Sequence, residues 1–406
     1  MESIVLDVPE TNYQGVEQFI SSSPWDHQAL MNQVALDASG MFGGDGKTGL
    51  FLDESAFPKK GKCSVGVKRQ YCGRLGKVDN CQVGVFACLG REGQVALSDL
   101  RLYLPEDWAG DQARLEKAKV PEQKRRYAAK WELALEMVGH SRELGLEYGF
   151  IGFDSLYGSN HEFTNRLDDL GELFVGDVRR DIKVWLSEPE LRPGDKPGKQ
   201  VVANGAQQAG VGELAALHFD RGHKAVHFRQ GTKGQQWARI WTREVWLWEQ
   251  GWSRARRRVL IVRREEDDSF KFTLCNLPSG KSAKYYAWHQ GQRFWVEYAF
   301  HEAKSQLGMA DYQVRLWRGW HHHMSLLSLA LLFTAKLKLE VKGEMPLLSV
   351  RDITELLDFY LPRRRVDESS VLANIHSRHE QRQVDLDKRK EKRVGLPPGY
   401  EINGFN

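Results

Sequence analysis

Three acidic residues stand where a carboxylate could help to hold metal ions. Asp53 follows the apolar run GLFL, and Asp154 follows the run FIGF. Each aspartate therefore comes at the predicted end of a short buried strand, where the chain leaves the core. Glu297 lies in the helical pattern RFWVEYAFHEAKSQLG. Carboxylates from two neighbouring strands and a nearby helix can converge, and their oxygens suit hard divalent cations.

Such a site would favour phosphoryl transfer, in which bound cations activate a water or hydroxyl and stabilise the leaving oxygen. Arg293 lies one helical turn before Glu297, and Lys304 lies two turns after it, so the three side chains share one face. The two cationic residues are candidates for binding a phosphate backbone. Ion pairs on a solvated helix surface are the structural alternative.

Two other acidic residues compete for the same roles. Glu54 is adjacent to Asp53, but successive strand residues face opposite sides of a sheet, so we expect only Asp53 to reach the site. Glu302 is the rival on the helix, and it should point away from Glu297 because five residues turn a helix by about 500°. An acidic pair in a solvated strand-end turn is the simpler interpretation of Asp53 and Glu54 taken alone.

Composition sets broad limits on the protein. A chain of 406 residues with a net charge of +4 is long enough for a large core, and the charge alone is a weak sign of an acidic partner. Its basic clusters suit a polyanion, yet they also suit solvated loops. They lie at residues 59–62, 254–264, 363–365 and 388–393.

The same survey favours a cytoplasmic protein that is not bound to a membrane. The five cysteines are odd in number and lack zinc-site spacing, which favours reduced thiols. The longest apolar stretch, residues 324–335, is too short to span a bilayer, and the N-terminus has no secretory pattern.

The elements that must position the acidic residues follow from periodicity and turn signals. We expect a first helix from the N-cap Ser23 to about residue 39, and a helix ending near Gly145. Strands are predicted in SVGVKRQY, CQVGVFACL and QVALSDLRLYLP. Around Asp154 we expect a strand before it, a helix over residues 163–170 and a further strand at residues 173–175.

The segment from residue 191 to residue 282 has a β-rich character and reads as an insertion, with a hairpin turn at residues 265–269. Its tryptophans fit sheet packing better than base stacking; they are Trp241, Trp246, Trp248 and Trp252. Helical patterns return afterwards, over residues 317–339 and in a shorter helix capped by Ser349. The charged tail from residue 363 is expected to be largely disordered.

Three blocks of the sequence resemble insertion-sequence transposases of the DDE superfamily endonuclease type. LDESAFPKKGKCSVGVKRQYCGRLGKVDNCQVGVF resembles their first-aspartate region, and DSLYG resembles their second-aspartate motif. RFWVEYAFHEAKSQLGMADYQVRLWRGWHHHMSLLSLA resembles their glutamate helix. In relatives with a Tyr-Arg-Glu-Lys signature, the Arg and Lys have the spacing that Arg293 and Lys304 have about Glu297, and Gln290 stands in the place of the tyrosine.

The resemblance extends from about residue 13 to residue 339 and implies an α/β fold. This fold is an RNase H-like mixed sheet flanked by helices, with the β-rich insertion before the catalytic glutamate helix. The implied organisation has five parts. They are an N-terminal helical segment (1–47), the first part of the core (48–189), the insertion (190–285), the C-terminal core helices (286–345), and a C-terminal helix with a charged tail (346–406).

The resemblance also implies a transposase that cleaves DNA and transfers the strand. Asp53, Asp154 and Glu297 would be the catalytic residues and would bind two Mg²⁺ ions, with Mn²⁺ as a substitute. The implied DNA-binding residues are Arg293, Lys304, Lys59, Lys60, Arg69, Lys233 and Arg315. The implied partners are the terminal repeats of the element, the target DNA and a second copy of the chain in a synaptic homodimer.

Two other functions fit the same residues. One is a DNA-binding remnant of such an element without catalysis, because relatives usually carry a longer helical stretch before SSSPWD. The other is an RNase H-like nuclease that only hydrolyses DNA, since hydrolysis and strand transfer use the same carboxylates.

Overall fold

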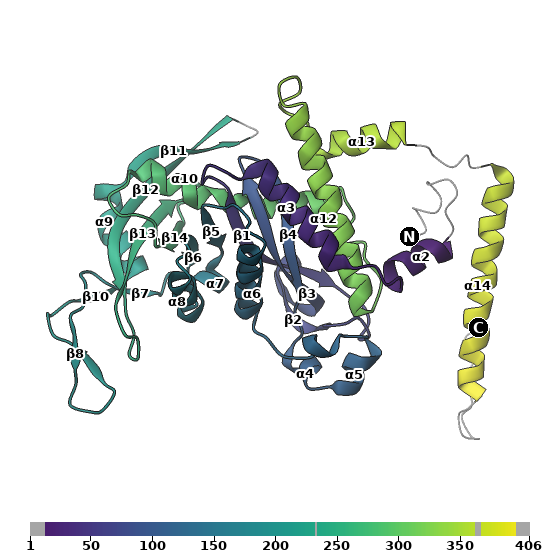
Figure 1. Cartoon of the computed structure of the whole chain (residues 1–406), viewed down its shortest axis with the longest axis horizontal. Coiled ribbons are helices and arrows are strands. Elements are labelled where there is room, and N and C mark those ends of the chain that lie inside the picture. Colours follow the sequence, from purple (N-terminus) through teal and green to yellow (C-terminus); the bar gives the residue numbers. More distant parts are fainter. Residues whose placement is uncertain (1–12, 232–233, 362–366, 395–406) are drawn as a thin grey trace. The chain divides into compact units, whose positions relative to one another are not determined.

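The computed structural model of the chain describes residues 13–231, 234–361 and 367–394 (Figure 1). The chain divides into two units, and the larger, Ile20–Leu357, contains the predicted site residues that the structure describes. The other unit includes the described residues 13–19, 358–361 and 367–394. Lys233, a predicted DNA contact, lies outside the described residues.

A mixed sheet of 12 strands forms the centre of the larger unit. The strands run in the order β10-β7-β12-β13-β14-β6-β5-β1-β3-β2, with β11 beside β12 and β4 beside β3. Their bounds are β1 Gly49–Pro58, β2 Lys68–Cys72, β3 Lys77–Arg91, β4 Gln94–Leu102, β5 Phe150–Phe153, β6 Phe174–Val178, β7 Lys183–Trp185, β10 Gln208–Gly210, β11 Lys224–Gly231, β12 Gly234–Leu247, β13 Arg256–Arg264 and β14 Phe270–Cys275. A separate two-stranded sheet joins β8 Leu191–Pro193 to β9 Gln200–Val202.

Strand β1 pairs with its two neighbouring strands over different lengths. Antiparallel β3 pairs with all ten residues of β1, whereas parallel β5 pairs only with the first four, ending at Leu52↔Phe153. The strand therefore continues through Asp53 instead of ending there, because β3 still holds its backbone. On the β5 side the sheet opens beyond Leu52, and β5 itself ends just before Asp154.

Apolar side chains alternate between two cores on opposite faces of the sheet. Phe51 lies in the core shared with α10, α11 and α12, whereas Leu50 and Leu52 lie in the core shared with α3, α6 and α8. Phe150 and Val175 belong to the first of these faces, which we call the α11 face. Helices thus cover both faces of the sheet, as in Figure 1, and the architecture is RNase H-like.

The helices have the following bounds: α2 Tyr13–Ser21, α3 His27–Phe42, α4 Glu106–Ala109, α5 Gln112–Lys117, α6 Lys130–Glu143, α7 Ser155–Gly158, α8 His161–Asp169, α9 Val211–Gly222, α10 Ala283–Gln292, α11 Phe294–Ser305, α12 Trp317–Glu340, α13 Val350–Tyr360 and α14 Glu368–Val394. Two 3₁₀ turns, η1 Gly73–Leu75 and η2 Glu122–Lys124, complete the set. Within the described parts of the chain, no helix has the length and apolar character needed to cross a membrane. All five cysteines are free thiols.

The β-rich segment that we predicted as an insertion continues the central sheet. Strand β14 pairs antiparallel with β6, so β12, β13 and β14 extend the central sheet instead of forming a sheet of their own. The edge of β6 would otherwise expose unpaired backbone groups, and β14 covers it. The predicted hairpin turn is confirmed, because the Glu265 N–H donates to the Ser269 carbonyl at 2.9 Å.

Two local expectations also need correction. Helix α3 begins at His27 with Asp26 as its N-cap, because the Asp26 carboxylate accepts the Gln28 N–H at 2.8 Å; Ser23 was the wrong cap. The tail that we expected to be disordered contains the helix α14. The cap of α13 is confirmed, because the Ser349 hydroxyl accepts the Asp352 N–H at 3.2 Å.

Candidate active site

Asp53 and Asp154 occupy equivalent places on neighbouring strands. Each follows the last residue of the parallel β1–β5 ladder, Leu52↔Phe153. Side chains alternate along a strand, so Asp53 lies on the same face as Phe51. Asp154 lies four residues after Phe150, so the same alternation places both aspartates on the α11 face. The sheet therefore brings the two predicted aspartates together.

The two aspartates differ in their local contacts. Asp154 is the N-cap of α7, and its Oδ1 accepts the Leu156 N–H at 2.9 Å. Burial raises the pKa of the Asp154 carboxyl, while the charge of Arg293 opposes the rise. Burial, and then the charge of Asp154, raise the pKa of Asp53 to about 7, against the opposing effect of Arg293. Burial therefore disfavours the ionised form of both carboxyls, and the charge of Arg293 opposes this effect.

Arg293 joins the helix to the sheet. It lies at the junction between α10 and α11, where it has a helical conformation with φ −56° and ψ −26°. Its Nη1 lies 3.6 Å from Asp53 Oδ2, and its Nη2 donates to Glu297 Oε1. Its Nε lies 3.0 Å from Asp177 Oδ2, without the alignment of a hydrogen bond. One guanidinium thus bridges three carboxylates.

The charge of Arg293 is strongly held. Burial disfavours the charged guanidinium, but the carboxylates of Asp177, Glu297 and Asp53 outweigh burial and raise its pKa above the usual value. Glu297 belongs to the first turn of α11, and its side chain is 50% exposed. It therefore faces open space at the edge of the site, and its link to Asp53 runs through Arg293.

The three predicted metal ligands do not form a ready-made metal site. In the part of the chain that the structure describes, no three His, Cys, Asp or Glu side chains are grouped closely enough to hold a metal ion. Asp53 and Asp154 are brought together, whereas Glu297 is paired with Arg293. The expected convergence of all three carboxylates is therefore incomplete in this arrangement.

The two rival acidic residues point elsewhere, as predicted. Glu54 Oε2 lies 2.6 Å from Lys130 Nζ of α6, on the face opposite to α11. Glu302 is buried, with 8% of its surface exposed, and its Oε1 lies 3.3 Å from His301 Nδ1. Strand alternation and helical rotation therefore direct both side chains away from Arg293, although the charge of Glu54 still contributes to the raised pKa of Asp154.

Sequence reasoning missed Asp177, a third aspartate on the α11 face. It lies on β6 two residues after Val175, so alternation places it on the same face as Asp53 and Asp154. Its Oδ2 also lies 3.0 Å from Lys271 Nζ. The signal was present in the sequence, because Asp177 follows an apolar run in FVGDV just as Asp53 follows GLFL.

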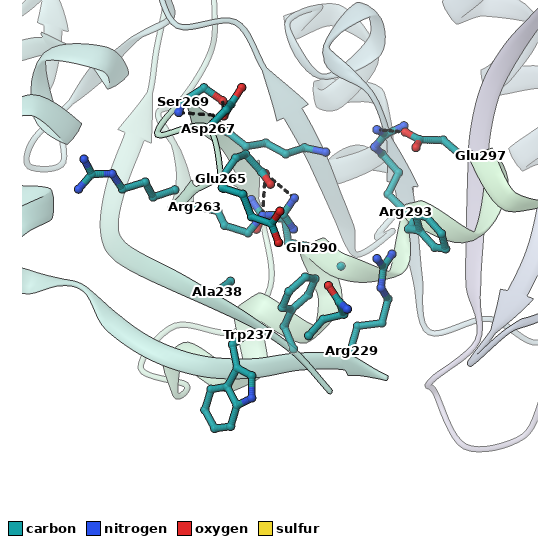
Figure 2. Close-up of a pocket in the computed structure, with 17 residues that line it drawn as sticks. Arg229, Trp237, Ala238, Arg263, Glu265, Asp267, Ser269, Gln290, Arg293 and Glu297 are labelled. Atoms are coloured by element: carbon teal, nitrogen blue, oxygen red, sulfur yellow. Dashed lines mark hydrogen bonds and ion pairs between the residues drawn. The ribbon is translucent and has the colours of Figure 1, made fainter. Parts of the chain in front are cut away.

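A cavity of about 500 Å³ opens beside Arg293 and Glu297 (Figure 2). Its wall is mixed in charge, with the basic residues Arg229, Arg263, Arg264, Lys271 and Arg293 and the acidic residues Glu265, Glu266, Asp267 and Glu297. The Arg229 guanidinium stacks on the Phe294 ring, 3.6 Å from its centre. Trp237 borders the cavity with 64% of its surface exposed, in contrast to the buried Trp241. Arginines and an exposed aromatic ring suit a nucleic-acid backbone and bases.

A second cavity, of about 750 Å³, adjoins the aspartates. Asp154, Asp177, Arg180, Lys271 and Arg293 contribute to its wall. Lys271 and Arg293 also line the first cavity, so the two hollows meet at these residues. The carboxylates are therefore reached from a surface that carries several cationic side chains.

Besides Arg293, two of the predicted DNA contacts, Lys59 and Lys304, are partly buried. Lys59 Nζ donates to the Tyr312 carbonyl at 2.6 Å and lies 4.2 Å from the centre of that ring. Burial lowers the pKa of Lys59 to about 8. Lys304 lies near the site, because the charge of Asp53 acts on it. Burial, and then the charge of Arg74, lower the pKa of Lys304, and Asp53 opposes this decrease. The charge of Asp53 thus acts on Lys304, whereas Lys59 is held by Tyr312.

Three further predicted contacts are exposed. Lys60, Arg69 and Arg315 all have solvent-accessible side chains. A hydrogen bond of 2.9 Å from the Val65 N–H to the Arg315 carbonyl ties the loop after β1 to the segment before α12. The segment between Lys60 and Arg69 is therefore held beside Arg315, which lies about 250 positions later in the chain.

Comparison with known proteins bears on the same residues. Residues 1–235 match the sequence profile of a family described as DDE superfamily endonuclease, a range that includes Asp53 and Asp154 and ends before Glu297. A protein of Microchaete diplosiphon, described as a probable transposase for insertion sequence element IS701, is 30% identical over 172 residues. That match spans 41% of this chain and 41% of the relative.

Proposed function

The chain belongs to the family of DDE superfamily endonucleases, and from this premise we propose that it is the transposase of an insertion sequence. It would cleave DNA at the ends of its element and join the freed 3′-hydroxyl to target DNA. The observation that carries this proposal is the placement of Asp53 and Asp154 at the end of one parallel ladder, with Glu297 linked to Asp53 through Arg293. The relative described as a probable transposase supports the same conclusion.

The residues of the site fit divalent cations in their chemistry. All three predicted ligands, Asp53, Asp154 and Glu297, offer carboxylate oxygens, which Mg²⁺ and Mn²⁺ prefer. Burial, and then the adjacent carboxyl of Asp154, raise the pKa of Asp53, and a bound cation would favour its ionised form. Two bound ions would activate the attacking water or hydroxyl and stabilise the leaving oxygen. Asp53 and Asp154 would hold the ions from the sheet, and Glu297 would join them from α11.

The basic residues would bind and orient the DNA. Lys304, Lys60, Arg69 and Arg315 are the proposed phosphate contacts on the described surface, and Lys233 keeps this role as a prediction. A phosphate contact by Lys59 requires that its ammonium leave the Tyr312 carbonyl. Arg293 would neutralise the carboxylates before DNA arrives and then turn part of its guanidinium towards a phosphate. Such contacts position the backbone and carry no base specificity.

A strand-transfer assay tests the proposal. The full-length chain is mixed with DNA that carries the flanking ends of its element and with a supercoiled target plasmid, in Mg²⁺. We expect nicks that leave 3′-hydroxyls at the element ends, followed by joined products. Nicks without joining would support a hydrolysis-only nuclease, and tight binding without nicks would support a DNA-binding remnant.

A further inference from the structure

Both carboxylate oxygens of Asp177 contact other side chains of the protein. Its side chain is 12% exposed, and its Oδ2 is paired with Arg293 Nε and Lys271 Nζ, each at 3.0 Å. Its Oδ1 accepts the Thr273 hydroxyl at 2.7 Å. Both oxygens are therefore occupied by protein donors or cations. With a cation or a hydrogen-bond donor at each oxygen, this carboxylate can hold its neighbours in place.

Thr273 and Gln290 hold Asp177 in turn. Thr273 lies on β14 directly opposite Asp177 on β6, and its side chain is fully buried. The Gln290 Nε2 donates to the Thr273 hydroxyl oxygen at 2.8 Å, so that hydroxyl both accepts from Gln290 and donates to Asp177. Gln290 itself is 3% exposed. These groups form a buried hydrogen-bonded chain that leads from α10 to β6.

Gln290 and Arg293, the two ends of this chain of contacts, lie on one helical segment. Gln290 lies in the last turn of α10, and Arg293 follows it by three residues, so both side chains can face the sheet from one side. Gln290 fixes Asp177 through Thr273, and Asp177 fixes the guanidinium of Arg293. The glutamine thus has a specific role at the position where the resembling signature has a tyrosine.

We propose that Asp177 is a positioning residue of the active site. Through the Gln290–Thr273–Asp177 chain, it holds the Arg293 guanidinium against the catalytic carboxylates. This inference rests on the proposed function for its effect on cleavage, but the contacts can be tested without cleavage. When Asp53 and Glu297 take other partners, Asp177 is the carboxylate that keeps Arg293 beside the site. Part of the Arg293 guanidinium can then turn to a DNA phosphate while Asp177 keeps the side chain beside the site.

A double-mutant cycle on cleavage tests the proposal. Asp177→Asn keeps the size of the side chain and removes its charge, so the cleavage rate at saturating DNA should fall roughly 10- to 100-fold, as expected for a misplaced catalytic neighbour. Arg293→Ala should cost at least as much. Because Asp177 acts through Arg293, the double variant should cleave no more slowly than Arg293→Ala alone. Multiplying losses would overturn the proposal.

Thr273 offers a conservative pair of variants. Thr273→Val keeps the shape but removes the hydroxyl, and should lower the rate as Asp177→Asn does. Thr273→Ser keeps the hydroxyl and should restore most of the rate. Asp181→Asn is the matched control, because Asp181 is an exposed aspartate whose contact is Arg179; its rate should not change. Equal loss in Thr273→Val and Thr273→Ser would contradict the chain of contacts.

Arginine labelling separates this inference from the proposed function. Phenylglyoxal modification, read by mass spectrometry, should label Arg293 slowly in the unmutated chain, because its side chain is 15% exposed. Labelling should become several-fold faster in Asp177→Asn and Thr273→Val. Arg256, which is 12% exposed and paired with Asp168, should stay protected in every variant. If nothing cleaves but Arg293 labels as described, the proposed function fails and the positioning role stands; unchanged labelling of Arg293 would refute that role.

Discussion

Asp53 and Glu54 are adjacent in the chain, yet the sheet sends their side chains to opposite faces. Asp53 faces Arg293, and Glu54 is paired with Lys130 of α6. We therefore expect a metal-dependent role for Asp53 and none for Glu54. The difference provides a matched pair of variants, because each change replaces one carboxylate by an amide of the same size.

We expect Asp53→Asn to lower Mg²⁺-dependent cleavage by orders of magnitude, because the amide cannot supply the charge that holds the ion. DNA binding should survive, and it should tighten slightly because a negative charge near the phosphates is removed. Glu54→Gln should cleave at close to the unmutated rate. Gel assays of cleavage and filter binding measure both effects, and near-normal cleavage by Asp53→Asn would remove this residue from the metal site.

The helical turn of α11 directs the side chains of Glu297 and Glu302 in different directions. Glu297 has a half-exposed side chain at the site, whereas Glu302 is buried in the protein. Glu297→Gln should therefore abolish cleavage with little change in the thermal midpoint. Glu302→Gln should instead lower the stability, by about 1–2 kcal/mol, with cleavage largely kept. Thermal melts and cleavage rates of the two variants should give this crossed pattern; the reverse pattern would show that the helix presents the other face.

The packing of α3 against α12 should make stability sensitive to acid. Burial, and next the charge of His322, lower the pKa of His27 from 6.5 to about 4; Asp26 opposes this, and Arg101 and Arg318 add to it. Between these pH values the unfolded chain binds a proton that folded His27 does not. Stability should therefore fall as the pH decreases from 6.5 to 4, by an amount on the order of 1–2 kcal/mol.

Urea unfolding at pH 7 and pH 5 measures this effect. The loss of stability at pH 5 should be smaller in His27→Gln than in the unmutated chain. His301→Gln is the control, because the His301 side chain is 72% exposed and lies on α11; it should leave the acid loss unchanged. An equal acid loss in the His27→Gln variant would assign the effect to other groups.

Element-level patterns explain which features the sequence could predict. GLFL and FIGF are short apolar runs followed by an aspartate, and local alternation was enough to place Asp53 and Asp154. Asp177 follows the same rule, but its role depends on β14, which lies almost a hundred residues later and pairs with β6. Strand partners that are distant in sequence leave no periodic signal. The continuation of the sheet through β12–β14 was missed for the same reason.

Helix ends show the same limit on a shorter scale. Ser23 and Asp26 are both good N-cap residues, and Pro24 favoured the earlier start. The structure selects Asp26, whose carboxylate accepts the Gln28 N–H. The link from Arg293 to three carboxylates was also beyond prediction, since it requires the positions of β1, β6 and α11 at once.

At the scale of the larger unit, basic side chains from separate parts of the chain lie on the surface. Lys60 and Arg315 are exposed and are held in one region by the Val65–Arg315 backbone hydrogen bond. The carboxylates of the site are partly neutralised by Arg293. This surface can therefore attract DNA while the carboxylates remain available for catalysis.

This arrangement predicts a steep dependence of DNA affinity on salt. Each phosphate contact releases condensed counterions, so Lys60→Ala and Arg315→Ala should each reduce the slope of log affinity against log salt by roughly 0.9. Arg166→Ala is the matched control, because Arg166 is exposed on α8, which packs against the opposite face of the sheet. Its slope should equal that of the unmutated chain. Binding titrations between 50 and 200 mM salt, roughly the range over which such contacts are lost, measure all three slopes. If Arg166→Ala lowers the slope and Arg315→Ala does not, DNA lies on the other face of the sheet, away from Asp53 and Asp154.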